Sequence, residues 1–247
     1  MTRAIILAAG QGRRLLPLTA DRPKCLLEVA GKSLLEWQVD CLLDAGIAEV
    51  MVVTGFRAEA VDAVVTRRYS GRGVAALFNP FFEVADNLAS CWLARGAMSS
   101  DFILLNGDTL FEPAVLDRLL RSPPAPITLT VDRKDVYDDD DMKVQLDGMQ
   151  VRHVSKTLPH DQIQAESIGM LCFRGEGPEL FRGALESAIR HPTSLRLWYL
   201  SMIDALAGRD CVQACAITGL RWAEIDFPAD LDRAGALFAG QARGARR

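Results

Sequence analysis

Several features that mark whole classes of protein are missing from this chain of 247 residues. The six cysteines include no C-x-x-C pair, and no histidine accompanies the close pair Cys211 and Cys215, which disfavours a zinc site. Only three histidines are present and they are spread out, so neither a histidine-based triad nor a metal-binding helix is indicated. No apolar run approaches the roughly 20 residues that a membrane span requires. A net charge of −4 does not favour binding to the negatively charged backbone of nucleic acid.

The start of the chain also lacks a positively charged segment followed by an apolar stretch and a cleavage site. We therefore expect a cytoplasmic protein with no nucleic acid or membrane partner, whose cysteines are mostly buried free thiols. An apolar content of 49% is enough for the core of one large α/β domain. We predict a single domain over residues 1–240 and a disordered tail over residues 241–247.

Buried apolar runs alternate with amphipathic segments through the first half of the chain. The expected strands there are 4–9, 49–54, 74–78 and 102–105, and the expected helices are 33–45, 57–68, 87–98 and 113–121. The second half predicts short strands over 127–131, 142–146, 151–155 and 167–173, helices over 179–189, 198–207 and 228–238, and a last strand ending near Asp226. Ser33 and Glu36 form a capping pattern, Gly46 stops that helix, and Asp147-Gly148 predicts a hairpin. This order predicts an α/β fold with a doubly wound, mostly parallel sheet and a small β-rich subdomain.

A glycine-rich turn follows the first predicted strand, in a segment that runs from Ala4 to Leu27. Gly10 and Gly12 lack side chains, so their backbone N–H groups can approach an anion closely. Arg14 and Lys24 follow and supply fixed positive charge beside the turn. The pattern indicates a cradle for a triphosphate with a cation placed to act on a reacting phosphate.

Two better-known phosphate loops do not fit this segment. A dinucleotide fingerprint, G-x-G-x-x-G, requires a glycine where Leu15 stands. A Walker A loop has its tail in Gly31-Lys32-Ser33, but Leu26 stands where its first glycine belongs. The phosphate loop is therefore of another kind.

Two aspartates follow predicted strands and are candidate metal ligands. Asp108 ends Leu-Leu-Asn-Gly-Asp and Asp226 ends Trp-Ala-Glu-Ile-Asp. Ligands gather at the carboxyl ends of the strands in an open parallel sheet, and paired carboxylates suit Mg²⁺. A strand-end turn or a helix cap is the alternative role for each aspartate. The acidic run Asp138–Asp141 is better explained as a solvated loop than as a metal site, because adjacent like charges repel.

The pattern L-A-A-G-x-G-x-R-L with a later Pro23-Lys24 resembles the signature of the nucleotidyltransferases that activate sugar phosphates and related phosphate monoesters. The resemblance implies a Rossmann-like nucleotidyltransferase fold, catalytic roles for Arg14 and Lys24, and Mg²⁺ held by Asp108 and Asp226. It implies nucleotide contacts from Leu7, Ala8, Ala9, Gly10, Gly12, Arg14, Asn79 and Asn87. It also implies an acceptor site at Lys156 and Glu166, although a solvated hairpin lysine is an equally good explanation of Lys156 from the sequence alone.

The segment from Asn79 to Trp92 departs from the sugar-specific pattern, because Asn87 stands near the position of a usual glycine. It resembles the phosphocholine cytidylyltransferase branch, which implies transfer of CMP from CTP to a small phosphate monoester or phosphonate with release of pyrophosphate. A cationic acceptor would need aromatic faces, for which the candidates are Phe81, Phe82, Trp92, Trp198, Tyr199 and Trp222. Two alternatives remain: a sugar-1-phosphate uridylyl- or thymidylyltransferase, and a non-catalytic nucleotide-binding regulator.

Overall fold

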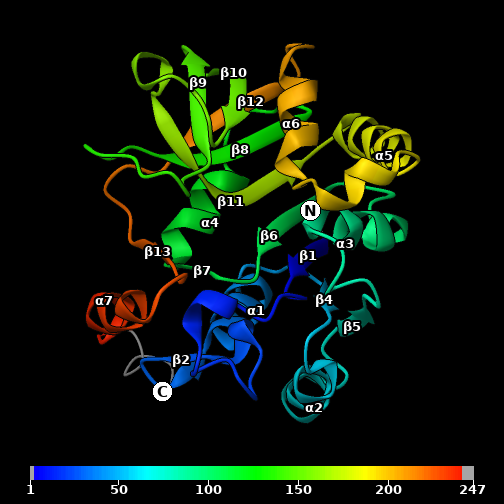
Figure 1. Ribbon diagram of the computed structural model, residues 1–247, viewed down its shortest axis with the longest axis vertical. Helices are drawn as coiled ribbons and strands as arrows, with labels where there is room; N and C mark the ends of the chain where they lie inside the picture. Colours follow the sequence, from blue (N-terminus) through cyan, green and yellow to red (C-terminus); the bar gives the residue numbers. More distant parts are fainter. Residues whose placement is uncertain (1–2, 241–247) are drawn as a thin grey trace.

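The computed structural model describes residues 3–240, so the expected tail at 241–247 lies outside the described residues (Figure 1). The strands are β1 (Arg3–Leu7), β2 (Glu28–Val29), β3 (Lys32–Ser33), β4 (Glu49–Thr54), β5 (Val74–Phe78), β6 (Phe102–Asn106), β7 (Thr109–Phe111), β8 (Ile127–Asp132), β9 (Lys143–Asp147), β10 (Gln150–Ser155), β11 (Ala165–Phe173), β12 (Val212–Ala216) and β13 (Trp222–Glu224). The α-helices are α1 (Leu34–Asp44), α2 (Ala58–Tyr69), α3 (Asn87–Leu93), α4 (Pro113–Leu120), α5 (Gly177–Ala188), α6 (Leu200–Ala207) and α7 (Pro228–Phe238).

Among these residues, nine strands form one sheet in the order β5-β4-β1-β6-β11-β8-β12-β10-β9. Strands β5, β4, β1 and β6 pair in parallel, as the alternation of strands and helices predicts. From β11 onward most pairings are antiparallel, although β8 and β12 are parallel. The α/β class and the doubly wound first half are confirmed, and the β-rich second half extends the same sheet (Figure 1).

Helices cover both faces of the sheet and bury them. Successive strand residues point to opposite sides, so one strand contributes to two cores. In β1, Ile5 and Leu7 belong to the core that includes residues of α3, α5 and α6. Ala4 and Ile6 belong to the opposite core, which includes residues of α1, α2 and α4. Figure 1 shows α5 and α6 side by side next to the sheet, with α3 below them.

The predicted local signals are present. The Ser33 side chain accepts a hydrogen bond from the Glu36 N–H, and the Glu36 carboxylate accepts one from the Ser33 N–H, so α1 begins with a capping box. Gly46 follows the helix with a φ of 82°, the left-handed conformation of a helix stop. Asp147 pairs with Gln150 across the β9–β10 hairpin, where Gly148 has a φ of 63°.

The structure also contains strands that the sequence did not predict. Strand β12 lies between β8 and β10, although its Val-Gln-Ala-Cys-Ala sequence has weak β propensity. Tertiary pairing with β8 therefore decides its conformation. Helix α3 ends at Leu93 and continues as a 3₁₀ turn over Ala94–Ala97, so the α-helix is shorter than expected. No helix within the described residues is both long and apolar enough to cross a membrane.

Candidate active site

The glycine-rich turn leaves the end of β1 and enters a short 3₁₀ turn at Arg13–Leu15. Gly12 has a φ of 73°, and a Cβ atom there would lie 3.0 Å from the Lys24 side chain. A Cβ atom at Gly10 would meet no atom within 4 Å, because this backbone faces the open cleft. Gly12 thus allows Lys24 to pack against the turn, and Gly10 leaves room for a ligand.

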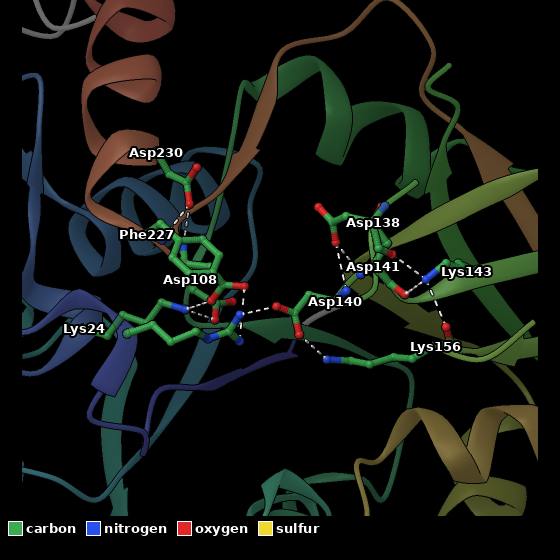
Figure 2. A network of polar contacts seen from close by, with 11 residues as sticks. Lys24, Asp108, Asp138, Asp140, Asp141, Lys143, Lys156, Phe227 and Asp230 are labelled. Atoms are coloured by element: carbon green, nitrogen blue, oxygen red, sulfur yellow. Dashed lines mark hydrogen bonds and ion pairs between the residues drawn. The ribbon is translucent and has the colours of Figure 1, made fainter. Parts of the chain in front are cut away.

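Lys24 forms ion pairs with both of the aspartates that were predicted to bind a metal. Its Nζ lies 2.7 Å from Asp226 Oδ1. The same atom lies 2.6 Å from Asp108 Oδ2 (Figure 2). Asp108 follows β6, whereas Asp226 follows β13, which pairs antiparallel with β7 and so brings the two carboxylates to one end of the sheet. Burial alone would lower the pKa of Lys24, but the negative charges of the two aspartates outweigh it and raise that pKa. The lysine is therefore a fixed positive charge.

A third carboxylate, Glu224, lies in the same cluster and was missed by the sequence analysis. Single carboxylate oxygens of Asp108, Glu224 and Asp226 lie within 4.8 Å of one another. Loss of surrounding water, and then the charges of the two aspartates, raise the pKa of Glu224 to about 8, although the side chain still faces the cleft. Its spacing from Asp226 was a usable signal, because residues two apart on a strand share one face.

The carboxylate cluster fits a divalent cation such as Mg²⁺. It presents hard oxygen donors, and Asp108 Oδ1 is buried without a hydrogen-bond partner. A buried oxygen in that state is costly unless a cation or donor approaches it. Within the described residues, this is the one carboxylate cluster with metal-binding spacing.

A cavity of about 260 Å³ extends from the glycine-rich turn across the end of the sheet. Its lining includes most of the predicted nucleotide residues and consists of Leu7, Ala9, Gly10, Asn79, Phe82, Ala85, Asp86, Asn87, Ser90, Asn106, Asp108 and Trp198. The Asn79 amide is held locally, donating to Ser90 Oγ at 3.0 Å and accepting from the Phe81 N–H at 2.8 Å. Asn87 Oδ1 accepts the Tyr199 N–H at 2.9 Å, which orients the Asn87 amide at the cavity wall.

A second cavity of about 160 Å³ adjoins the first, since the two share Asn87, Asn106, Asp108 and Trp198. Its other lining residues are Arg14, Asp140, Met142, Lys156, Ser167, Gly169, Leu200, Glu224 and Asp226. Lys156 therefore faces the cleft rather than bulk solvent alone, and its Nζ lies 4.3 Å from the centre of the Trp198 ring. Arg14 reaches the same cavity, with Nη2 3.6 Å from Asp226 Oδ2.

The acidic run is an exposed loop without regular secondary structure, as the sequence indicated, but its conformation is fixed by local hydrogen bonds. Its backbone forms a turn in which Asp138 Oδ1 accepts the N–H groups of Asp140 and Asp141. Asp140 reaches the cleft, where Oδ2 lies 2.6 Å from Arg14 Nη1 and Oδ1 lies 3.3 Å from Lys156 Nζ. The sequence did not indicate that two of the four acids, Asp140 and Asp141, have lysine partners.

Glu166, predicted to face the acceptor, lies in a different environment. It is buried on β11 and pairs with Lys134 Nζ at 2.8 Å, and Lys134 also reaches Asp141 at 2.7 Å. Burial raises the pKa of Glu166 to about 7; Lys134 opposes this rise and Asp141 adds to it. Glu166 lines neither of the two cavities, so its predicted contact with an acceptor stays a prediction.

Of the six aromatic candidates, Trp198 is the one that lines both cavities. Phe82 lines the larger cavity, whereas Tyr199 is fully buried and donates from its hydroxyl to Asn106 Oδ1. The Trp222 indole N–H donates to Asp132 Oδ2 at 2.7 Å. The cleft thus offers one exposed indole face beside a lysine.

Comparison with known proteins identifies the family to which this chain is similar. Residues 4–214 match the family described as MobA-like NTP transferase domain. The chain is 32% identical over 248 residues to the CMP-5'-(3-aminopropyl)phosphonate synthase of Streptomyces rubellomurinus, a match that covers 96% of this chain but only 39% of that protein. It is 25% identical over 252 residues to the CTP:phosphoglutamine cytidylyltransferase of Campylobacter jejuni, covering 93% of this chain and 97% of that protein. The solved inositol-1-phosphate CTP transferase of T. maritima has a TM-score of 0.82 at 22% identity, covering 99% of this chain and 97% of that one, and so supports the fold.

Proposed function

The chain belongs to the MobA-like NTP transferase family, and on that premise we propose that it transfers CMP from CTP to a small phosphate monoester or phosphonate and releases pyrophosphate. An acceptor phosphate oxygen attacks the α-phosphorus of CTP, the new P–O bond forms there, and the bond to the β-phosphate breaks. The acceptor phosphate is already ionised at neutral pH, so no general base is needed. Catalysis then consists of alignment and neutralisation of charge.

The residues of the cleft divide this work between them. Backbone N–H groups of the Gly10–Gly12 turn and the guanidinium of Arg14 bind the departing phosphates. Lys24 holds positive charge where the α-phosphate meets the acceptor. Lys156 binds the acceptor phosphate as a compact point charge.

One observation carries the proposal: Lys24 Nζ lies within 2.7 Å of carboxylates from Asp108 and Asp226, and Asp108 lines both cavities. Three segments far apart in the sequence meet there and supply both a fixed cation and metal-binding oxygens. A non-catalytic nucleotide-binding regulator has no need for this combination.

The fit of the carboxylates supports Mg²⁺ as the cofactor. Asp108, Glu224 and Asp226 would hold it, since their oxygens lie within 4.8 Å of one another and Asp108 Oδ1 lacks a partner. Bound there, the ion would neutralise charge on the triphosphate. The two aspartates also keep Lys24 charged and in place.

The choice of CTP and of a small acceptor rests on the relatives. The Campylobacter jejuni relative is named as a CTP-dependent cytidylyltransferase, and the Streptomyces rubellomurinus relative as a synthase of a CMP-phosphonate. The walls of the larger cavity at Asn79 and Asn87 come from the segment that departs from the sugar-specific pattern. Hydrogen bonds that a wrong base leaves unmade would provide the selection.

The test is pyrophosphate release from CTP, UTP, dTTP and GTP, each with a panel of acceptors that includes phosphocholine, aminoalkylphosphonates and glucose-1-phosphate. We expect kcat/KM for CTP to exceed that for UTP by roughly ten- to a hundredfold, with small phosphates or phosphonates as acceptors. A preference for UTP or dTTP with glucose-1-phosphate would contradict the proposal and favour the sugar-specific alternative.

A further inference from the structure

Asp140 links two cations that come from opposite sides of the cleft. Its Oδ2 lies 2.6 Å from Nη1 of Arg14. Its Oδ1 lies 3.3 Å from Nζ of Lys156 (Figure 2). Arg14 follows the glycine-rich turn, whereas Lys156 follows β10. One carboxylate therefore bridges the N-terminal half of the sheet and the β-rich half.

The turn that carries Asp140 is exposed, but one buried lysine anchors its backbone. The Lys143 ammonium, on a side chain that is 5% exposed, donates to the backbone carbonyls of Asp138, Asp141 and Lys156. Lys143 therefore ties the turn directly to the backbone of Lys156, the residue after β10. Figure 2 shows the Asp140 side chain extending from this anchored turn, with the Lys156 ammonium beside one of its carboxylate oxygens.

The contacts of Asp140 have the form of phosphate contacts. Arg14 and Lys156 are the cations that the proposed function assigns to the departing phosphates and to the acceptor phosphate. A carboxylate and a phosphate both offer anionic oxygens to such donors. Arg14 and Lys156 therefore bind incoming phosphates less strongly while they are paired with Asp140.

We infer that Asp140 is an internal competitor of the substrates, holding Arg14 and Lys156 together until phosphate groups take its place. The inference rests on the proposed function for the roles of the two cations. In the cleft without substrate, Asp140 keeps Arg14 and Lys156 oriented and neutralises part of their charge. When substrate binds, the link that Asp140 forms between the two halves of the sheet is released.

The contact is weak enough to be exchanged. The side chains of Arg14 and Asp140 are 45% and 50% exposed, so water screens their attraction. A triphosphate carries more charge than one carboxylate and can replace it. Removing the competing charge should therefore tighten binding of a phosphate ligand by roughly three- to tenfold at low ionic strength.

The experiment measures binding of inorganic pyrophosphate by calorimetry to the wild type, Asp140→Asn and Asp140→Ser. Asp139→Asn is the matched control, because it removes one charge from the same exposed turn at a residue with no ion pair among the described residues. We expect the dissociation constant to fall roughly three- to tenfold in both Asp140 variants and to change less than about twofold in the control. The gain should disappear at high salt.

A second arm measures the KM for the acceptor in the variants that turn over, and it should fall in both Asp140 variants while the control stays unchanged. Equal or weaker pyrophosphate binding in both Asp140 variants, or no pyrophosphate binding by any of the proteins, would overturn the inference. Absence of nucleotidyl transfer with every acceptor would overturn the proposed function instead, because the pyrophosphate measurement does not depend on turnover.

Discussion

Replacement of Lys24 by methionine is the perturbation that separates catalysis from folding most clearly. Methionine keeps an apolar stem of similar length against the glycine-rich turn but removes the ammonium group. Loss of one preorganised positive group costs about 10²–10³ in rate, or roughly 3–4 kcal/mol of transition-state stabilisation. We therefore expect kcat to fall at least about a hundredfold with a smaller change in the KM for CTP.

The same substitution also affects stability, and its size follows from the geometry. The two carboxylates that lose their partner are 23% and 22% exposed. Breaking a fully buried pair costs about 3–5 kcal/mol, so partial exposure reduces the expected loss to about 2–3 kcal/mol. For a chain of this length that corresponds to a fall in Tm of roughly 4–12 °C. Added Mg²⁺ should recover part of this loss, because it replaces the missing positive charge.

The assay pairs steady-state pyrophosphate release with thermal unfolding followed by circular dichroism. Lys32→Met is a matched control, since Lys32 pairs with Asp40 at 2.6 Å with side chains 21% and 22% exposed, outside the cleft. The control should lose some stability and keep its turnover. Near-normal turnover in Lys24→Met, or an equal loss of turnover in both variants, would refute the assigned role of Lys24.

Three further outcomes follow from the described contacts. EDTA should abolish activity and Mg²⁺ restore it, and Asp108→Asn and Asp226→Asn should each lower kcat at least about a hundredfold; EDTA-resistant turnover would refute the metal assignment. Burial and then Asp141 raise the pKa of Glu166 from 4.5 to about 7, so between these pH values the folded protein holds a proton that the unfolded chain has lost. The Tm should therefore fall as the pH rises from 4.5 to about 7, and Glu166→Gln should make the Tm less dependent on pH in this range. Gly169 has a φ of +71°, and a Cβ atom there would lie 2.3 Å from Asn106 Nδ2, so Gly169→Ala should cost about 2–3 kcal/mol in urea unfolding; an unchanged midpoint would contradict this.

The sequence predicted the features that local patterns determine. The glycine-rich turn, the capping box of α1 and the Asp147-Gly148 hairpin each depend on a few adjacent residues, and each is present. The sequence also suggested that Asp108 and Asp226 could meet, but not the means: Asp226 follows β13, which pairs with β7 in a separate two-stranded sheet. What the sequence could not supply was Lys24 lying between them, which depends on how the turn packs.

Features that depend on pairing between distant segments were harder to predict. Strand β12 has weak intrinsic preference and forms because β8 and β10 lie on either side of it. Asp140 pairs with Lys156 and Asp141 pairs with Lys134. A run of four acids in the sequence does not indicate which lysine each of them will meet. The resemblance assigned Glu166 to the acceptor, which stays a prediction, but it did not indicate the ion pair of Glu166 with Lys134.

Labelled phosphorus atoms in CTP distinguish attack at the α-phosphorus from transfer of the terminal phosphate. The purified protein is incubated with Mg²⁺, an acceptor on which it releases pyrophosphate, and CTP labelled either at the α- or at the γ-phosphorus. We expect the α-label to appear in the CMP–acceptor product and the γ-label to leave entirely as pyrophosphate. Transfer of the γ-label to the acceptor, or release of inorganic phosphate in place of pyrophosphate, would contradict attack at the α-phosphorus.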